Sequence, residues 1–325
     1  MDVRWEKTKE IEKLLIRIEV AKSIINLLPP LPNLQAKLQR ESLLKSSLFS
    51  AKIEGNTLQL SQIQSMDSNP QELEKKEVAN LFKATTLVKN IREDLTLEKV
   101  KEIHSFVMDQ ISPESGELRT EPSAIFNQAG IAIYMTPPPQ EITKLIQGLL
   151  EFINLQDESV SIANVAVSHY KFEKIHPFLD GNGRVGRLIS SFHMRNLGFE
   201  FKNLISFEEY VHENRDRYYY GLSLPNQNIT EFVEFFLSAI AVSAENIIEK
   251  MKNKKEETVE DTLLPRRAEI LYVIRDHEII SFDQIRRRFL KVSERALHND
   301  LVALVKVGLI KKLGATRGAM YSPSY

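Results

Sequence analysis

Twelve consecutive residues constrain this chain more than any other segment. Residues 176 to 187 read His-Pro-Phe-Leu-Asp-Gly-Asn-Gly-Arg-Val-Gly-Arg. His176 precedes a proline, which biases its backbone away from the helical region, so we expect an apolar helix around residues 162–175 to end there. The imidazole of His176 should then sit on a loop, exposed and free to act as a base.

The second half of the segment has the features of an anion-binding turn. Gly181 and Gly183 allow a tight turn whose backbone N–H groups point outward at the start of a helix over residues 184–196. Arg184 and Arg187 are three residues apart, so they share one face of that helix and can both reach a polyphosphate. The segment therefore predicts a phosphate-handling site.

This segment resembles the signature of the Fic family, His-Pro-Phe-x-Asp/Glu-Gly-Asn-Gly-Arg-x-x-Arg, and matches every fixed position of it. Members are mainly helical enzymes that move AMP from ATP onto a hydroxyl of a target protein. The resemblance implies that His176 is the base that deprotonates that hydroxyl and that Asp180 holds a magnesium ion. The positions it implies for phosphate binding are Gly181, Asn182, Gly183, Arg184 and Arg187. In-line attack at phosphorus needs such a base, a metal and preorganised donors.

The segment has two other interpretations. The first is a glycine-rich connection between two core helices, with surface arginines and a structural histidine. The second is a zinc site, but His169 and His176 lack the His-Glu-x-x-His spacing and the chain has no cysteine. His169 lies on an apolar helix and is expected to be a packed structural residue.

A second motif lies upstream. Residues 50 to 56 read Ser-Ala-Lys-Ile-Glu-Gly-Asn and resemble the inhibitory motif of the same family, Ser/Thr-x-x-x-Glu-Gly/Asn. Ser50 and Glu54 are four apart and share one face of a helix expected from about Asn33. The resemblance implies that Glu54 pairs with Arg187 and denies this arginine to the γ-phosphate of ATP. An ordinary polar helix face is the alternative.

A hairpin is expected within residues 123–139. Two short apolar runs, 124–126 and 131–134, flank the turn sequence Asn127-Gln-Ala-Gly130. In the Fic family a similarly placed flap clamps the target segment by strand addition; the alternative is a hairpin that only shields the core. Its flanks would be Gly116–Arg119 and Pro137–Pro139.

The resemblance also places Tyr218, Tyr219 and Asn226 near the adenine and ribose. The loop over residues 223–230 is one residue shorter than in the family form that it resembles. Paired aromatic residues on a helix are also typical of a packed core, so both interpretations remain open. Phe232, Phe235 and Phe236 are predicted to be core residues.

Composition indicates a soluble globular protein of two or three domains. The chain has 325 residues, of which 42% are hydrophobic and 27% charged. No apolar run approaches the length of a membrane span, and the N-terminus lacks a secretory pattern, so we expect a cytoplasmic protein. Without cysteine, disulfide and thiol chemistry are excluded.

Charge and helical periodicity divide the chain. Residues 262–325 contain 12 Lys or Arg and 6 Asp or Glu, whereas the preceding part contains 31 and 38. We therefore predict an N-terminal helical region over 1–95, a catalytic core over 96–248, a linker over 249–261 and a basic domain over 262–325. The helices expected before the linker, besides those above, cover 5–28, 61–66, 70–91, 97–110 and a stretch beginning at 214.

The basic segment resembles a winged helix-turn-helix. Helices are expected over 266–275, 281–289 and 293–307, followed by a two-stranded wing. Ser293, Arg295, His298 and Asn299 would lie on the recognition helix and Arg317 in the wing. Such modules bind DNA but also mediate dimerisation and protein recognition, and Arg286–Arg288 are equally consistent with a solvated face.

The predicted fold is mainly α, with a Fic-type helical core, a β-hairpin flap and a C-terminal winged helix-turn-helix domain. The predicted function is that of a protein adenylyltransferase that uses ATP and Mg²⁺ and is autoinhibited by Glu54. Its target would be a Ser, Thr or Tyr hydroxyl, the enzyme itself included, and DNA contact through 262–325 and homo-oligomer formation are left open. The rival functions are a DNA-binding regulator with a nucleotide-sensing domain, and removal of AMP or transfer of another phosphate-containing group.

Overall fold

The computed structural model describes residues 2–27, 32–64, 72–126, 132–155, 161–253, 260, 263–290, 292–314 and 319–324. It divides into two compact units. Unit 1 comprises Met1–Leu28 and Glu41–Lys250, and unit 2 comprises Pro29–Arg40 and Met251–Tyr325. The boundary near residue 250 lies inside the predicted linker. Helices from both sides of residue 95, where the sequence predicted the start of the catalytic core, pack into one core in unit 1.

Unit 1 is mainly helical. Its elements are α1 (Lys9–Leu27), α2 (Pro32–Ile53, which also contributes to unit 2), α3 (Leu60–Gln64), α4 (Leu73–Asn90), α5 (Leu97–Val107), β1 (Ala124–Phe126), β2 (Ala132–Met135), α6 (Pro139–Asn154), α7 (Ala163–Ile175), α8 (Asn182–Asn196), the 3-10 helix η1 (Phe201–Asn203), α9 (Phe207–Glu213), α10 (Arg215–Ser223) and α11 (Thr230–Asn253). Helices α6 and α9 were not predicted. The expected helix over 5–28 begins four residues later, at Lys9.

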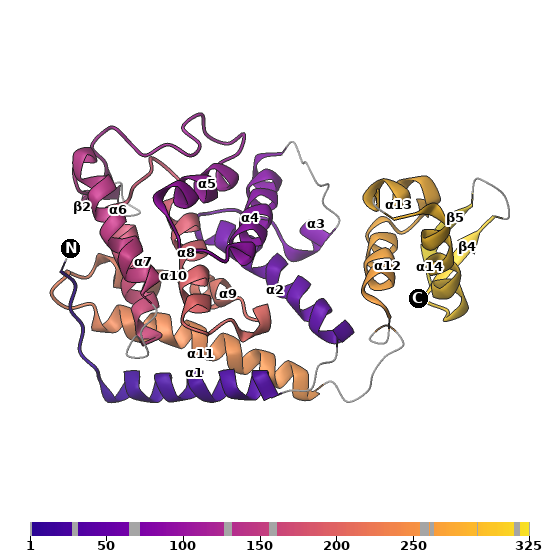
Figure 1. Ribbon diagram of the computed structural model, residues 1–325, viewed down its shortest axis with the longest axis horizontal. Coiled ribbons are helices and arrows are strands. Elements are labelled where there is room, and N and C mark those ends of the chain that lie inside the picture. Colours follow the sequence, from indigo (N-terminus) through magenta and orange to yellow (C-terminus); the bar gives the residue numbers. More distant parts are fainter. Residues whose placement is uncertain are drawn as a thin grey trace. The chain divides into compact units, whose positions relative to one another are not determined.

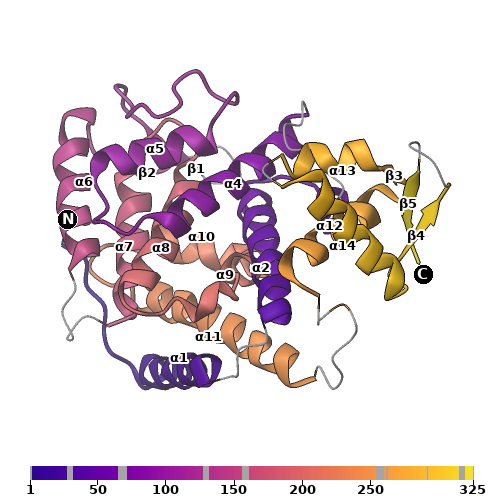
Figure 2. The same ribbon diagram turned by 45° about the vertical axis from the view of Figure 1, so that its right-hand side comes forward.

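Helices α7 and α8 form the centre of unit 1. Nearly every residue of both helices is buried, as expected for helices covered on all sides. Helix α8 packs against α4, α5, α6 and α7 (Figures 1 and 2). Phe232, Phe235 and Phe236 of α11 are buried as the sequence predicted. The segment between α7 and α8 is therefore held between two rigid helices.

Two peripheral features complete unit 1. Helix α1 runs beside α11 along the lower edge of Figure 1, joined to it by the bidentate pair of Arg17 with Glu245. Strands β1 and β2 pair antiparallel, with Ala124 opposite Met135 and Ile125 opposite Tyr134. The predicted turn over 127–130 lies outside the described residues.

In the part of the chain that the structure describes, unit 2 contains the beginning of α2, three further helices and a three-stranded antiparallel sheet of order β3-β5-β4. Its elements are α12 (Pro265–His277), β3 (Ile280–Ser281), α13 (Phe282–Arg288), α14 (Glu294–Lys306), β4 (Ile310–Leu313) and β5 (Met320–Pro323). The short strand β3 was not predicted.

Capping residues and a small core explain these elements. Ser281 forms a capping box with Gln284, and the Ser293 hydroxyl accepts from the backbone N–H of Ala296, so both helix starts follow the sequence signals. The buried carboxylate of Asp300 is held by Arg266 and Arg267 of α12. Predicted residue Arg317 lies outside the described part of the chain. None of the helices described in either unit is both long enough and apolar enough to cross a membrane.

Candidate functional site

The backbone between α7 and α8 forms a tight loop for local reasons. His176 caps α7 in the left-handed conformation, with φ 49° and ψ 62°, and its N–H donates to the carbonyl of Phe172. Gly181 precedes α8 with φ 79°, a value that favours glycine. Helix α8 begins at Asn182, two residues earlier than predicted, so the amides around Gly181–Gly183 lie at its N-terminus, where an anion is favoured.

His176 is partly buried, and the expectation of a freely exposed imidazole was wrong. Its carbonyl accepts a hydrogen bond of 2.8 Å from Arg119 Nε, and its Nδ1 lies 3.3 Å from the carbonyl oxygen of Glu173. Burial lowers the pKa of His176 below its usual value. Because the Glu173 carbonyl can only accept, Nδ1 carries the proton and Nε2 is left as the basic atom.

Arg119 is a component of the site whose role the sequence did not reveal. Its buried guanidinium donates to four main-chain carbonyls, which belong to Ile175, His176, Glu121 and Pro137. It therefore ties the end of α7 to both chain segments that flank the β1–β2 pair. The sequence placed Arg119 only in the segment Gly116–Arg119 that flanks the predicted hairpin.

The Asn182 side chain bonds the main chain of the loop between α7 and α8. Its Oδ1 accepts from the N–H of Phe178 at 2.9 Å, and its Nδ2 donates to the carbonyl of Phe178 at 2.8 Å. Both ends of the amide are thus used to close the loop. Asn182 therefore shapes this turn, and the donors left for the anion that the sequence predicts are backbone N–H groups.

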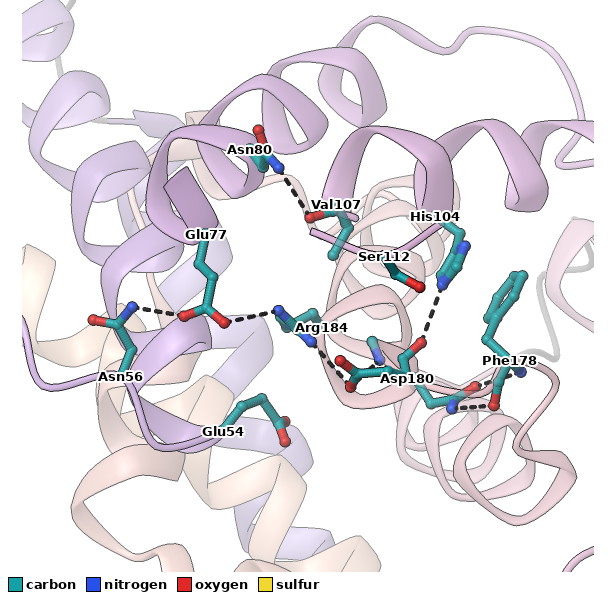
Figure 3. Close-up of polar contacts among 12 residues, drawn as sticks. Glu54, Asn56, Glu77, Asn80, His104, Val107, Ser112, Phe178, Asp180 and Arg184 are labelled. Carbon is teal, nitrogen blue, oxygen red and sulfur yellow. Dashed lines mark hydrogen bonds and ion pairs between the residues drawn. The ribbon is translucent and has the colours of Figure 1, made fainter. Parts of the chain in front are cut away.

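Asp180 and Arg184 lie together at the start of α8 (Figure 3). Asp180 Oδ1 accepts from Arg184 Nη2 at 3.1 Å and from the N–H of Gly181 at 2.5 Å, and its side chain is 67% exposed. The buried Arg184 also contacts Glu77 of α4, whose other oxygen accepts from Asn56 Nδ2. The sequence did not reveal Glu77, which is 107 residues from Arg184.

Arg187 meets both residues of the upstream motif. Its Nε donates to Ser50 Oγ at 3.0 Å, and its Nη2 donates to the Ser50 carbonyl at 2.9 Å and to Glu54 Oε1 at 2.8 Å. Its Nη1 is buried without a partner among the described residues. Although burial disfavours the charged guanidinium, the Glu54 carboxylate raises the pKa of Arg187 above its usual value.

The glycine at position 183 provides space for this contact. A Cβ atom there would lie 2.3 Å from Glu54 Oε1 and 3.1 Å from Arg187 Nη1. Any larger residue would displace the Glu54 carboxylate or the arginine. The end of α2 therefore lies against the first turn of α8. The sequence predicted that the phosphates of a nucleotide bind at this position.

The three residues expected near the adenine and ribose lie in different environments. Tyr218 is buried and its hydroxyl is 2.7 Å from His169 Nε2, so its ring belongs to the core and is not presented to a ligand. Tyr219 is 37% exposed and donates to the carbonyl of Ile53. Asn226 Oδ1 accepts from the Tyr170 hydroxyl at 3.0 Å. His169 is a packed structural residue, as the sequence predicted.

Comparison with known proteins identifies one family over part of the chain. Residues 94–194, which include α5, α7 and the loop up to Arg187, match the Fic/DOC family. The chain contains a Fic/DOC domain. The segment from His176 to Arg187 lies near the end of the matched residues.

The Fic/DOC domain is shared with relatives of modest identity. The chain is 28% identical over 212 residues to "Protein adenylyltransferase Fic" of Drosophila yakuba, covering 61% of this chain and 40% of the relative. It is 26% identical over 239 residues to the protein of the same name from Drosophila virilis, covering 69% and 46%. The aligned part thus spans less than half the length of these relatives.

Solved structures share the fold. A Fic family protein from Desulfovibrio desulfuricans superposes with a TM-score of 0.69 at 22% identity, covering 99% of this chain and 98% of that one. Fic-1 from C. elegans gives a TM-score of 0.63 at 23% identity, covering 75% and 73%. At these identities the likeness establishes the fold alone.

Proposed function

We propose that this protein transfers AMP from ATP to a hydroxyl side chain of a target protein. The observation that carries the proposal is the juxtaposition of a neutral histidine with a helix N-terminus and two buried arginines. His176 ends α7, and the amides of Gly181–Gly183 lie at the start of α8. The buried Arg184 and Arg187 follow in the first turns of α8. The relatives named protein adenylyltransferase support the assignment.

The chemistry uses these groups in a balanced step. The target hydroxyl oxygen attacks the α-phosphorus of ATP, the bond from that phosphorus to the bridging oxygen of the β-phosphate breaks, and pyrophosphate leaves. His176 Nε2 accepts the hydroxyl proton, which the neutral imidazole permits. The amides at the start of α8 and the guanidinium of Arg184 stabilise the negative charge on the phosphate oxygens.

The carboxylate of Asp180 is suited to a magnesium ion that binds together with ATP. Asp180 Oδ1 is occupied by Gly181 and Arg184, whereas Oδ2 makes no hydrogen bond within the described part of the chain, and the side chain is largely exposed. No cluster of three His, Asp or Glu among the described residues forms a metal cage. One carboxylate with phosphate and water ligands is the set that Mg²⁺ commonly takes. Bound there, the ion would neutralise phosphate charge.

Glu54 is proposed to inhibit this reaction. By occupying Arg187 it removes the guanidinium that would otherwise bind the γ-phosphate, so that bound ATP is held in the wrong orientation. Ser50 contributes by holding the same guanidinium through its hydroxyl and its carbonyl. Release of the end of α2 would then activate the enzyme.

The β1–β2 pair is proposed to be the flap that docks the target segment. Arg119 fixes both of its ends relative to His176, so a peptide added to the edge of this pair would present its hydroxyl in a constant position. Main-chain pairing of this kind accepts varied sequences. It supports a protein target rather than a small molecule.

Unit 2 is proposed to be a winged helix-turn-helix domain. Arg295, His298 and Asn299 are all exposed along α14, and the His298 ring stacks on Phe282 with ring centroids 3.9 Å apart. Its net positive charge favours DNA as its partner. Retardation of a DNA duplex at low salt that falls steeply as salt rises would support this role, and no retardation at low salt would favour protein recognition instead.

The transfer activity is tested directly with purified protein, labelled ATP and cell lysate, followed by mass spectrometry of the labelled bands. AMP attached to a Ser, Thr or Tyr hydroxyl, absent with a His176→Ala variant, is the expected result. Label from the γ-phosphate, or loss of AMP from a premodified protein without transfer, would instead favour one of the rival reactions.

A further inference from the structure

His104 of α5 is a buried residue in direct contact with the loop between α7 and α8, which carries Asp180. Its ring stacks on Phe178 with centroids 3.7 Å apart and an interplanar angle of 3°. Its Nε2 lies 3.0 Å from the main-chain carbonyl of Asp180, as Figure 3 shows, and its Nδ1 accepts from the N–H of Gly116 at 2.8 Å. The ring is therefore held by three contacts.

These contacts determine which ring nitrogen carries the proton. A main-chain N–H can only donate, so Nδ1 of His104 must be unprotonated to accept from Gly116. The proton of the neutral ring then lies on Nε2. Nε2–H donates to the Asp180 carbonyl, which can only accept. The directions of both hydrogen bonds, from Gly116 to His104 and from His104 to Asp180, are therefore fixed.

The loop also has no freedom to slide over α5 at this point. A Cβ atom on Gly181 would lie 2.9 Å from Met108 Sδ and 3.5 Å from His104 Cδ2, so the glycine backbone packs directly on α5. The hydrogen bond from His104 thus anchors the peptide between Asp180 and Gly181. That peptide contains the Gly181 N–H, which donates to Asp180 Oδ1, and its first residue carries the Asp180 carboxylate.

We propose that His104 is a positioning residue for Asp180. By holding the Asp180 carbonyl inward, it directs the carboxylate outward to where a metal-bound triphosphate would lie. The inference rests on the proposed function, in which Asp180 binds magnesium. It predicts that the His104 hydrogen bond is needed for metal-dependent nucleotide binding and not only for folding.

Three substitutions separate the contacts. His104→Phe retains a ring on Phe178 but loses both hydrogen bonds. His104→Gln places an amide nitrogen near the position of Nε2 and can still donate to the Asp180 carbonyl. His104→Asn can replace only the acceptor for Gly116. All are made in a Glu54→Gly background, and thermal unfolding identifies the folded variants.

The readouts are ATP affinity with and without Mg²⁺ by calorimetry, and the Mg²⁺ concentration for half-maximal AMP transfer. His104→Phe should lose about tenfold in Mg²⁺-dependent ATP affinity and need correspondingly more Mg²⁺, with metal-free ATP binding nearly unchanged. His104→Gln should recover most of both values, and His104→Asn should not. If His104→Phe does not fold, the comparison of Gln with Asn decides the question.

Two results would overturn the inference. One is unchanged Mg²⁺ dependence in folded His104→Phe or His104→Asn, and the other is equal loss in the Gln and Asn variants. Failure of the proposed function looks different, because the parent Glu54→Gly protein would then show neither Mg²⁺-dependent ATP binding nor AMP transfer.

Discussion

The Glu54 carboxylate and the Arg187 guanidinium form an ion pair of 2.8 Å between residues 133 positions apart. The Arg187 side chain is almost fully buried, while that of Glu54 is 34% exposed. Breaking such a pair leaves a buried charge without compensation unless another anion replaces the carboxylate. In the proposed function the γ-phosphate of ATP is such an anion, and the same arginine would serve either inhibition or catalysis.

The assignment of His176 as the base gives the first prediction. His176→Ala should retain ATP binding, because the amides and arginines around the loop remain, but should lose AMP transfer by about 10²-fold or more. Radiolabel transfer and calorimetric ATP binding measure the two properties separately. Transfer at the wild-type rate by this variant would refute the mechanism.

A second prediction concerns the packing of α7 on α8. A Cβ atom at Gly186 would lie 2.4 Å from Glu173 Oε1 and 3.1 Å from Phe172 Cδ1. Gly186→Ala should therefore lower the free energy of unfolding by about 1–3 kcal/mol. The matched control is Gly148→Ala in α6, where no atom lies within 4 Å of the added Cβ; it should raise stability by about 0.5–1 kcal/mol. Urea unfolding measures both, and equal effects would contradict the packing described.

The third prediction is a pH dependence of stability. Burial raises the pKa of Glu173 from 4.5 to about 8. Between these pH values the unfolded carboxyl has released its proton while the folded one retains it, so the free energy of unfolding contributed by Glu173 falls as pH rises. Glu173→Gln removes this loss.

Urea midpoints at pH 5 and pH 8.5 test the effect. The stability of Glu173→Gln relative to wild type should increase between the two pH values. Glu151→Gln on the exposed face of α6 is the control, and its difference from wild type should stay constant. A constant difference for Glu173→Gln as well would show that the carboxyl is ionised in the folded protein throughout.

The contiguous parts of the site were predictable and the distant ones were not. The order of residues 176–187 indicated a loop followed by a helix start, because proline and glycine act locally on the backbone. The i, i+4 spacing of Ser50 and Glu54 likewise indicated one helix face. Arg187 meets both of these residues in the structure.

Contacts between remote segments left no local signal. His104 is 76 residues from Asp180, and Glu77 is 107 residues from Arg184. Nothing in the spacing of these residues distinguishes them from ordinary polar positions on helices. For Tyr218 the family resemblance suggested a contact with the adenine or ribose. In the structure its ring is buried, and its hydroxyl contacts His169.

The comparison of wild type, Glu54→Gly and the Glu54→Gly Arg187→Ala double variant tests the central claim most directly. In the proposed function, removing the carboxylate would free Arg187 for the γ-phosphate and align the α-phosphate with His176. AMP transfer, including onto the enzyme itself, should rise by about tenfold or more, equivalent to about 1.4 kcal/mol of activation free energy.

The double variant is the control, since activation and catalysis would act through the same guanidinium, and it should lose the gain. Initial rates of AMP transfer at matched ATP and Mg²⁺ concentrations are the measurement. A faster Glu54→Gly enzyme whose gain disappears with Arg187→Ala is the result that the ion pair predicts. A Glu54→Gly enzyme no faster than wild type would contradict autoinhibition by Glu54.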